Sequence, residues 1–197
     1  MNSQDSEVKQ QIRTRFANVA RSPENEQVFP VGPDSAKAVG YDAKEIDGLP
    51  VEFTESFSGV GNPLSLGHIE TGHTVLDLGC GAGLDAILAA RHVGPTGTVI
   101  GIDMTTEMLD KAKRNAVSAE VSNIEFHLGE AEELPVADET VYVVITNGVF
   151  NLCLDKPKVL AEIHRVLRPG GCLQMADILV HDDVTEKEVA CKGTWSD

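Results

Sequence analysis

The fold is decided by the stretch His73-Thr74-Val75-Leu76-Asp77-Leu78-Gly79-Cys80-Gly81-Ala82-Gly83-Leu84-Asp85. It predicts a buried strand over 73–79, a turn of alternating glycines and a helix that starts at Leu84. Glycines suit this turn because the backbone must bend sharply and a ligand must approach without a Cβ in the way. The amides at the start of the helix favour electron-rich ligand atoms. The stretch therefore indicates a loop that binds a nucleotide-type ligand.

The spacing of these glycines separates two kinds of ligand. A dinucleotide loop has the pattern G-x-G-x-x-G, which would require glycine at position 84, where this chain has Leu84. The chain has D-x-G-x-G-x-G, a loop that can close around an amino acid and a ribose, and Asp77 can attract a cationic ammonium group. We therefore expect S-adenosylmethionine as the cofactor, with S-adenosyl-L-homocysteine as its product. A nicotinamide-dependent oxidoreductase is the alternative that Leu84 disfavours.

Length and charge restrict the partners of the chain. With 197 residues the chain suits one domain with a sizeable core. Its formal net charge of −15 would repel both nucleic acid and an anionic membrane surface. We therefore expect no nucleic acid and no membrane as partners, and a small molecule as the substrate.

Neither a targeting signal nor a paired-cysteine motif occurs in the sequence. Residues 1–10 are polar, and no apolar run is long enough to span a membrane. The four cysteines contain no C-x-x-C pair, which argues against a disulfide framework and against a metal site. We therefore expect a cytoplasmic protein with reduced thiols and no bound metal.

A regular alternation of strands and helices begins at residue 73. Strands are predicted over 73–79, 98–103, 123–128, 141–146 and 172–179, and helices over 84–92, 105–119 and 158–167. This alternation predicts an α/β fold with a doubly wound, mostly parallel sheet that helices cover on both faces. We assign residues 61–180 to this core.

The first 60 residues are less regular. Apolar residues at helical spacing predict a helix over 5–21, which either packs on the domain or covers the ligand as a lid. Prolines mark 22–33 as a linker, and 36–63 reads as short polar pieces. We treat residues 1–60 as an N-terminal helical cap or lid, and residues 181–197 as a C-terminal tail.

The predicted ligand site lies at one edge of the sheet. In open parallel sheets, ligands bind beyond the carboxyl ends of the strands, where the strand order reverses. Asp103 ends the second strand and can accept both ribose hydroxyls, unless it caps the next helix. Glu130 or the amide of Ala131 can read the adenine edge, and the amide of Asn147 can hold cofactor or substrate. The predicted cofactor-binding residues are Asp77, Gly79, Cys80, Gly81, Gly83, Asp103, Met104, Glu130, Ala131 and Asn147.

The sequence assigns no catalytic residue. Methyl transfer from a sulfonium is an in-line displacement, so alignment and exclusion of water can supply most of the rate acceleration. A base is needed only if the acceptor arrives protonated. His127 and His164 fall within a predicted strand and a predicted helix, and His68 and His73 flank a turn without a carboxylate partner. The catalytic residues are therefore unknown from the sequence.

With these motifs in hand, the chain resembles the class I S-adenosylmethionine-dependent methyltransferases. Within this class it is similar to the arsenite methyltransferase family over nearly its whole length. The resemblance rests on Gly61-Asn62-Pro63, the glycine loop, Gly94-Pro95, Asp103-Met104-Thr105, Asn151-Leu152 before Asp155-Lys156, and the run from Arg165 to Gly171. It implies a Rossmann-like fold, S-adenosylmethionine as methyl donor and a small-molecule methyl acceptor.

Two positions depart from the arsenite methyltransferase pattern. That family binds arsenic(III) with cysteine thiolates, as ligand softness requires. Val60 and Gly148 stand where the family has two of these cysteines, whereas Cys153 and Cys191 could substitute and Cys172 reads as a core residue. The alternatives are therefore another acceptor, such as a quinone or a thiol, and a cofactor-binding protein with impaired catalysis.

The predicted sheet is short for class I. The class adds two further strands after the fifth parallel strand, for which residues 181–197 leave no room. A fifth strand at the sheet edge would expose unpaired backbone groups. We therefore expect a truncated sheet, and either an oligomer formed through that edge or a loss of activity.

Overall fold

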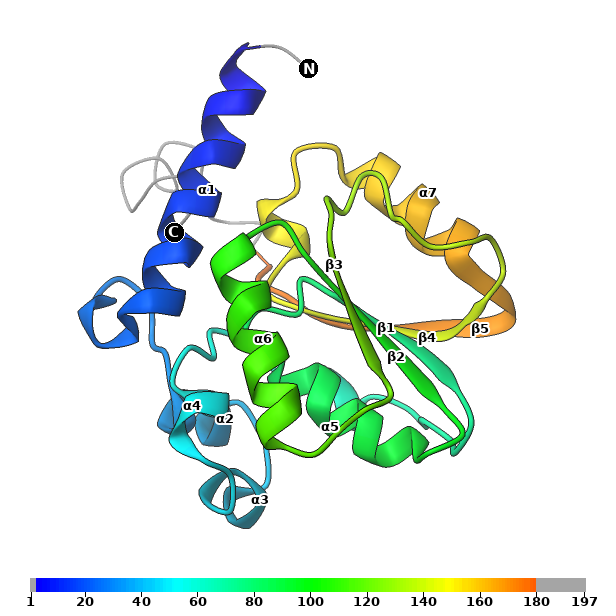
Figure 1. Cartoon of the computed structure of the whole chain (residues 1–197). Coiled ribbons are helices and arrows are strands. Elements are labelled where there is room, and N and C mark those ends of the chain that lie inside the picture. Colours follow the sequence, from blue (N-terminus) through cyan, green and yellow to red (C-terminus); the bar gives the residue numbers. More distant parts are fainter. Residues whose placement is uncertain (1–2, 180–197) are drawn as a thin grey trace.

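A parallel sheet of five strands forms the centre of the fold in the computed structural model, which describes residues 3–179 (Figure 1). The strands are β1 (Thr74–Leu78), β2 (Thr98–Asp103), β3 (Ile124–Leu128), β4 (Val141–Asn147) and β5 (Leu167–Ala176). Their order is β3-β2-β1-β4-β5, and each neighbouring pair is parallel. The strand order reverses between β1 and β4, so the ligand-binding switch point lies beyond the carboxyl ends of these two strands.

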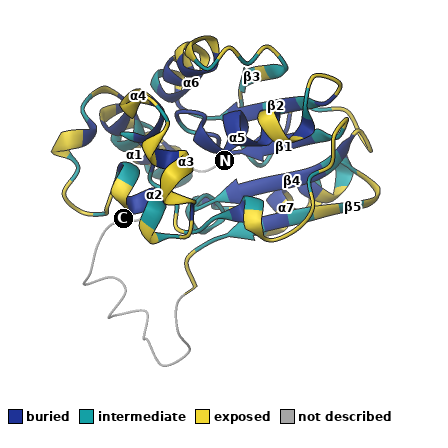
Figure 2. Cartoon of the chain, turned by 90° about the horizontal axis from the view of Figure 1, so that it is seen from below, coloured by how far each residue is buried: buried dark blue, intermediate teal, exposed yellow. Residues whose placement is uncertain are grey.

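Helices cover both faces of this sheet. The helices α5 (Leu84–Val93) and α6 (Thr106–Ser118) lie on one face, and α7 (Lys156–Val166) lies on the other (Figure 1). Side chains alternate between the faces, as strand geometry requires: Val75 packs with Ala89 of α5, whereas Leu76 packs with Ile163 of α7. Figure 2 shows the central strands β1 and β4 mostly buried and the edge strand β5 partly exposed. The predicted doubly wound α/β fold is confirmed.

The fifth strand differs most from its prediction. It begins at Leu167, directly after α7, and ends at Ala176. The prediction ended the helix at 167 and started the strand at 172, but residues 168–171 belong to the strand, which has an irregularity in its pairing with β4 between Val141 and Val143. Among the described residues β5 pairs only with β4, so association through its free edge stays a prediction. The predicted tail over 181–197 lies outside the described residues.

The N-terminal region contains more helix than the sequence suggested. It consists of α1 (Ser3–Arg21), α2 (Pro33–Ala38), α3 (Ala43–Asp47) and α4 (Val51–Thr54), with 3₁₀ turns at Pro23–Asn25 and Pro63–Ser65. The reading of 36–63 as short polar pieces was wrong, because Tyr41, Ile46 and Phe57 form a buried cluster with Leu84 and Leu88 of α5. Helices of four to six residues are too short to show a 3.6-residue period.

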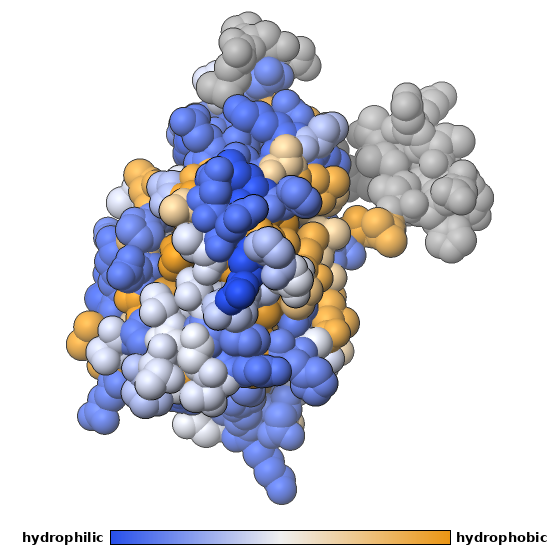
Figure 3. All heavy atoms as spheres, turned by 90° about the vertical axis from the view of Figure 1, so that its right-hand side faces the viewer, coloured by the Kyte–Doolittle hydropathy of each residue, from blue (hydrophilic) through white to orange (hydrophobic). Residues whose placement is uncertain are grey.

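One face of the molecule is mainly hydrophilic, as the charged and polar residues of the sequence lead us to expect. The face on the α7 side carries mainly hydrophilic residues, with apolar residues between them (Figure 3). Within residues 3–179, no helix combines the length and apolar character needed to cross a membrane. Three of the cysteines fall in the same range, and all three are free thiols.

Candidate functional site

The loop between β1 and α5 holds its three glycines in left-handed conformations. The φ angles are +75° at Gly79, +51° at Gly81 and +89° at Gly83. A Cβ on Gly79 would also lie 2.2 Å from Cγ2 of Val149, so both conformation and space require glycine there. The amides of Gly79 and Cys80 donate to the carbonyl oxygen of Ile102 at 2.8 and 2.9 Å. The loop is therefore fastened to the end of β2.

Asp103 links this loop to the start of α6. Its Oδ2 accepts from the amide of Gly81 at 2.9 Å, and its Oδ1 accepts from the amide of Thr105 at 2.8 Å. Burial raises the pKa of Asp103, and the hydrogen bonds from Thr105 and Gly81 oppose that rise. A carboxylate has about four acceptor positions, so each oxygen of Asp103 can still accept a ligand hydroxyl.

A pocket, called here the main pocket, lies at the switch point. Among its lining residues are seven of the predicted ones: Gly79, Gly81, Asp103, Met104, Glu130, Ala131 and Asn147. A second pocket, called here the side pocket, is lined by Cys80 and Asp85 and shares Gly79, Gly81 and Asn147 with the main pocket. Gly83 precedes the first residue of α5 and lines neither pocket. Of the ten predicted residues, eight therefore line these two pockets, and Asp77 and Gly83 line neither.

Helix α1 lies along the main pocket. The sequence did not decide whether this helix only packs on the domain or also covers the ligand as a lid. Lys9, Ile12 and Phe16 all line the pocket. Lys9 contacts Glu130 at 2.6 Å and Glu132 at 3.2 Å, and Arg13 contacts Glu130 at 2.5 Å. The structure therefore places α1 over the pocket. A helical period in the sequence reveals that one face of a helix is buried, but not what this face packs against. The pocket-lining residues of α1 could therefore not be identified from the sequence.

Glu130 has a different environment from the one predicted. Burial would raise the pKa of its carboxyl, but the ion pairs with Lys9 and Arg13 outweigh it and lower the pKa. The pKa of Lys9 is raised, because the two glutamates outweigh its desolvation. Glu130 therefore anchors α1, whereas Ala131, the other candidate for reading adenine, lines the pocket beside it.

Asp77 is buried without a counter-ion. The residue is 2% exposed, and its Oδ2 has no hydrogen-bond partner among the described residues. Burial raises its pKa well above the ordinary value, and the charges of Asp85 and Asp103 add to this rise. A buried carboxyl with an orphaned oxygen is expensive, so this oxygen is suited to a cationic or hydrogen-bond-donating ligand group.

Asn147 holds a neighbouring chain segment with its amide. Its Oδ1 accepts from the amides of Val60 and Gly61 at 2.8 and 3.2 Å. Its Nδ2 lies within hydrogen-bonding distance of the carbonyl of Gly61, the hydroxyl of Tyr41 and Oδ2 of Asp85. The amide of Asn147 therefore already has hydrogen-bond partners within the chain, and a ligand would compete with them for it. Asn147 nevertheless lines both pockets.

Val60 and Gly148, the two positions that depart from the arsenite methyltransferase pattern, face each other. A Cβ on Gly148 would lie 3.5 Å from Cγ1 of Val60. Of the remaining thiols, Cys153 lines the main pocket, and burial raises its pKa to about 12. Cys172 is exposed on the edge strand β5, so its assignment to the core was wrong.

No histidine within residues 3–179 lines the main pocket or the side pocket. His73 has a carboxylate neighbour after all, Glu70 at 3.7 Å, and its ring stacks on Tyr142. His127 lies 3.5 Å from Glu125. Neither histidine lines the main or the side pocket, and residues 3–179 contain no group of three or more metal-binding side chains.

Comparison with known proteins gives consistent matches. Residues 69–196 match the family model described as "Methyltransferase domain". An arsenite methyltransferase from Halobacterium salinarum is 40% identical over 187 residues, which cover 88% of this chain and 48% of that protein. A demethylmenaquinone methyltransferase from Listeria monocytogenes is 37% identical over 115 residues, covering 58% of this chain and 48% of that protein.

A solved structure agrees with these matches. The arsenic(III) S-adenosylmethionine methyltransferase from Chlamydomonas reinhardtii superposes with a TM-score of 0.62 at 38% identity, covering 73% of this chain and 48% of that chain. The expected Rossmann-like fold of class I is therefore confirmed. The chain spans about half the length of the curated relatives named above.

Proposed function

The chain belongs to the methyltransferase domain family, and we propose that it is an S-adenosylmethionine-dependent methyltransferase with a small-molecule acceptor. The observation that carries this proposal is that the glycine loop and Asp103 line a pocket at the switch point, with the carboxyl of Asp77 buried next to the loop at the end of β1. Parallel sheets bind their ligands at this place. The arrangement suits a ligand with a ribose at one end and an amino acid at the other.

The residues present fit the proposed cofactor. Asp103 has acceptor positions left for the ribose hydroxyls, and residues 129–131 line the pocket where the adenine would lie. The orphaned Oδ2 of Asp77 suits the ammonium group, and the first amides of α5, which have no side-chain cap, suit the carboxylate. The cofactor, when bound, supplies a methyl group activated on a sulfonium.

The residues of the chain itself would align the reaction and exclude water. Ile12 and Phe16 of α1 cover the main pocket, while Met104 and Val149 contribute apolar walls. Alignment of the reacting atoms and exclusion of water are the main means of accelerating a displacement in which charge disperses. No base is assigned, because a nucleophile that arrives deprotonated needs none.

Two classes of acceptor are proposed. The resemblance to arsenite methyltransferases favours arsenite, whereas the contact between Val60 and Gly148 favours an acceptor that needs no thiolate ligand, such as a quinol or an organic thiol. Labelled methyl donor incubated with arsenite plus glutathione, or with a quinol and thiol panel, distinguishes the classes. Turnover of arsenite would remove the second class, and turnover only in the panel would remove the first.

Binding is tested separately from turnover. Isothermal titration calorimetry with S-adenosylhomocysteine is expected to give saturable binding that NAD does not compete for. Competition by NAD would favour the oxidoreductase alternative. Binding without turnover of any acceptor would favour a cofactor-binding protein with impaired catalysis.

A further inference from the structure

Two buried carboxyls lie together behind the glycine loop. Asp77 comes from the end of β1, and Asp85 comes from the first turn of α5. Their exposed fractions are 2% and 8%, and Asp85 lines the side pocket. Asp77 lines neither pocket and lies directly before the glycine loop, whereas Asp85 follows it, so the two carboxyls flank the loop proposed to bind the cofactor.

The groups facing this pair are acidic or neutral. They are Tyr41 before α3, Cys80 in the glycine loop, Asp103 at the end of β2 and Asn147 at the end of β4. None of these four is a cation. Two neighbouring carboxylates in a buried site without a cation cannot both ionise at low cost, so they tend to share one proton.

The hydrogen bonds decide which carboxyl holds the charge. The hydroxyl of Tyr41 donates to Oδ1 of Asp85, and Nδ2 of Asn147 donates to its Oδ2 at 3.2 Å. Asp77 has one backbone donor, the amide of Ala86, and its Oδ2 has no hydrogen-bond partner among the described residues. Donors stabilise an ionised carboxylate, so Asp85 carries the charge and Asp77 carries the proton. Burial and the neighbouring charges of Asp85 and Asp103 raise the pKa of Asp77 well above its ordinary value, whereas the hydrogen bonds from Tyr41 and Asn147 oppose the effect of burial on Asp85, whose pKa lies at about 6.

Building on the proposed function, we propose that Asp77 and Asp85 act as one recognition pair for the cofactor's ammonium, and that binding displaces the proton they share. Tyr41 and Asn147 are the positioning residues that orient Asp85. The O–H bond of Asp77 breaks and its proton passes to the solvent buffer, while the ligand keeps its ammonium protons. The pair changes from one negative charge to two, and the ammonium offsets the added charge.

The pH dependence follows from this exchange. Binding an ammonium lowers the pKa of Asp77, so affinity rises with pH up to the pKa of Asp77 in the free protein and is flat above it. The lone positive charge of the ligand's ammonium is essential for this effect. A ligand that fills only the adenosine region should bind without releasing a proton.

Calorimetry in two buffers tests the proposal on the full chain. S-adenosylhomocysteine is titrated at about pH 7 in phosphate and in Tris, whose ionisation enthalpies differ, with 5′-methylthioadenosine as the ligand that lacks the amino acid. We expect about one proton released per S-adenosylhomocysteine and none per 5′-methylthioadenosine. Equal heats in both buffers for S-adenosylhomocysteine would overturn the proposal. Absence of binding for both ligands would overturn the proposed function instead.

Variants test whether the released proton comes from the pair of Asp77 and Asp85. Asp77→Asn should remove the buffer-dependent heat and weaken S-adenosylhomocysteine binding by roughly 10- to 100-fold. Tyr41→Phe removes a donor from Asp85 without removing a carboxyl, so proton release should extend to higher pH than in the unaltered chain. Tyr142→Phe, which changes a tyrosine that stacks on His73, is the matched control and should leave proton release unchanged. Unchanged release in Tyr41→Phe would exclude it as a positioning residue, even if Asp77→Asn does not fold.

Discussion

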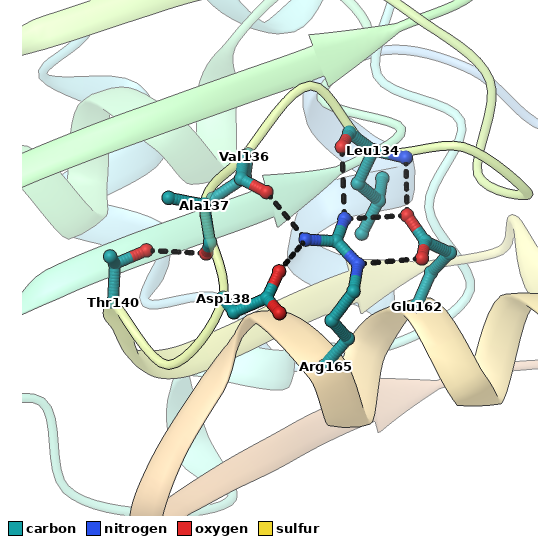
Figure 4. Close-up of polar contacts among 7 residues, drawn as sticks. All are labelled: Leu134, Val136, Ala137, Asp138, Thr140, Glu162 and Arg165. Carbon is teal, nitrogen blue, oxygen red and sulfur yellow. Dashed lines mark hydrogen bonds and ion pairs between the residues drawn. The ribbon is translucent and has the colours of Figure 1, made fainter.

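Arg165 and Glu162, one turn apart on α7, together hold the loop between β3 and β4 (Figure 4). Nη2 of Arg165 lies 2.6 Å from Oε2 of Glu162, and the same Oε2 accepts from the amide of Leu134 at 2.7 Å. The guanidinium also donates to the carbonyl oxygens of Leu134 and Val136 and to Asp138. Because this loop begins with residues 129–131, which line the main pocket, the pair supports the pocket from outside it.

Arg165→Gln should destabilise the chain by about 1–3 kcal/mol, because the side chain supplies every donor of its guanidinium to the loop or to Glu162. Urea unfolding measures the loss. Arg168→Gln is the matched control, since Arg168 is exposed and rests on the ring of Tyr142. Equal losses in the two variants would show that the loop contacts of Arg165 contribute nothing of their own.

Lys9→Met should loosen α1, because it removes the ion pairs with Glu130 and Glu132 while keeping an apolar stem of similar length. Amide hydrogen exchange in α1 should rise by roughly 5- to 30-fold, which corresponds to about 1–2 kcal/mol. Arg21→Ala, which removes the exposed pair with Glu107, is the control and should change exchange much less. The lid interpretation fails if both variants exchange alike.

The attachment of α1 should depend on pH only outside a wide window. The pKa of Glu130 is lowered from 4.5, so its contribution is present above that value and is lost as pH falls through the lower pKa of the folded state. The pKa of Lys9 is raised from 10.5, so its contribution is present below that value and is lost as pH rises through the higher pKa of the folded state. Limited proteolysis of α1 against pH should therefore show a plateau between 4.5 and 10.5. A transition inside this plateau would point to another titrating group.

Gly79→Ala should destabilise the chain by roughly 2–4 kcal/mol and prevent binding of S-adenosylhomocysteine. Its φ of +75° strains an L residue, and the new Cβ would meet Val149 at 2.2 Å. Gly40→Ala separates the two effects, because φ there is +101° but nothing lies within 4 Å of the added Cβ. This control variant should lose only the stability that backbone strain costs, and it should still bind S-adenosylhomocysteine. Thermal unfolding and calorimetry measure both quantities.

The sequence predicted the parts of the site that follow directly from strand ends. The glycine loop, Asp103 and residues 129–131 could be located because each follows a recognisable apolar strand. Tyr41 could not, since it lies 44 positions from Asp85, nor could Lys9, 121 positions from Glu130. No local period or spacing encodes such pairs, and α2 to α4 are too short to be seen by periodicity. The partners of Asn147 could not be found for the same reason, because they come from the N-terminal region.

Asp103→Asn should weaken ligands with a free ribose by about 10- to 100-fold, because it replaces a charged acceptor by a neutral amide. Calorimetry with 5′-methylthioadenosine and its 2′-deoxy analogue gives a double-mutant cycle. If Asp103 binds the ribose, removal of the ligand's 2′-hydroxyl should reduce the affinity of the unaltered chain far more than that of the variant. Asp110→Asn on α6 is the control, because Asp110 lines neither the main nor the side pocket. Additive losses in the cycle would instead mean that Asp103 serves only to fasten Gly81 and Thr105, and that the ribose is held elsewhere.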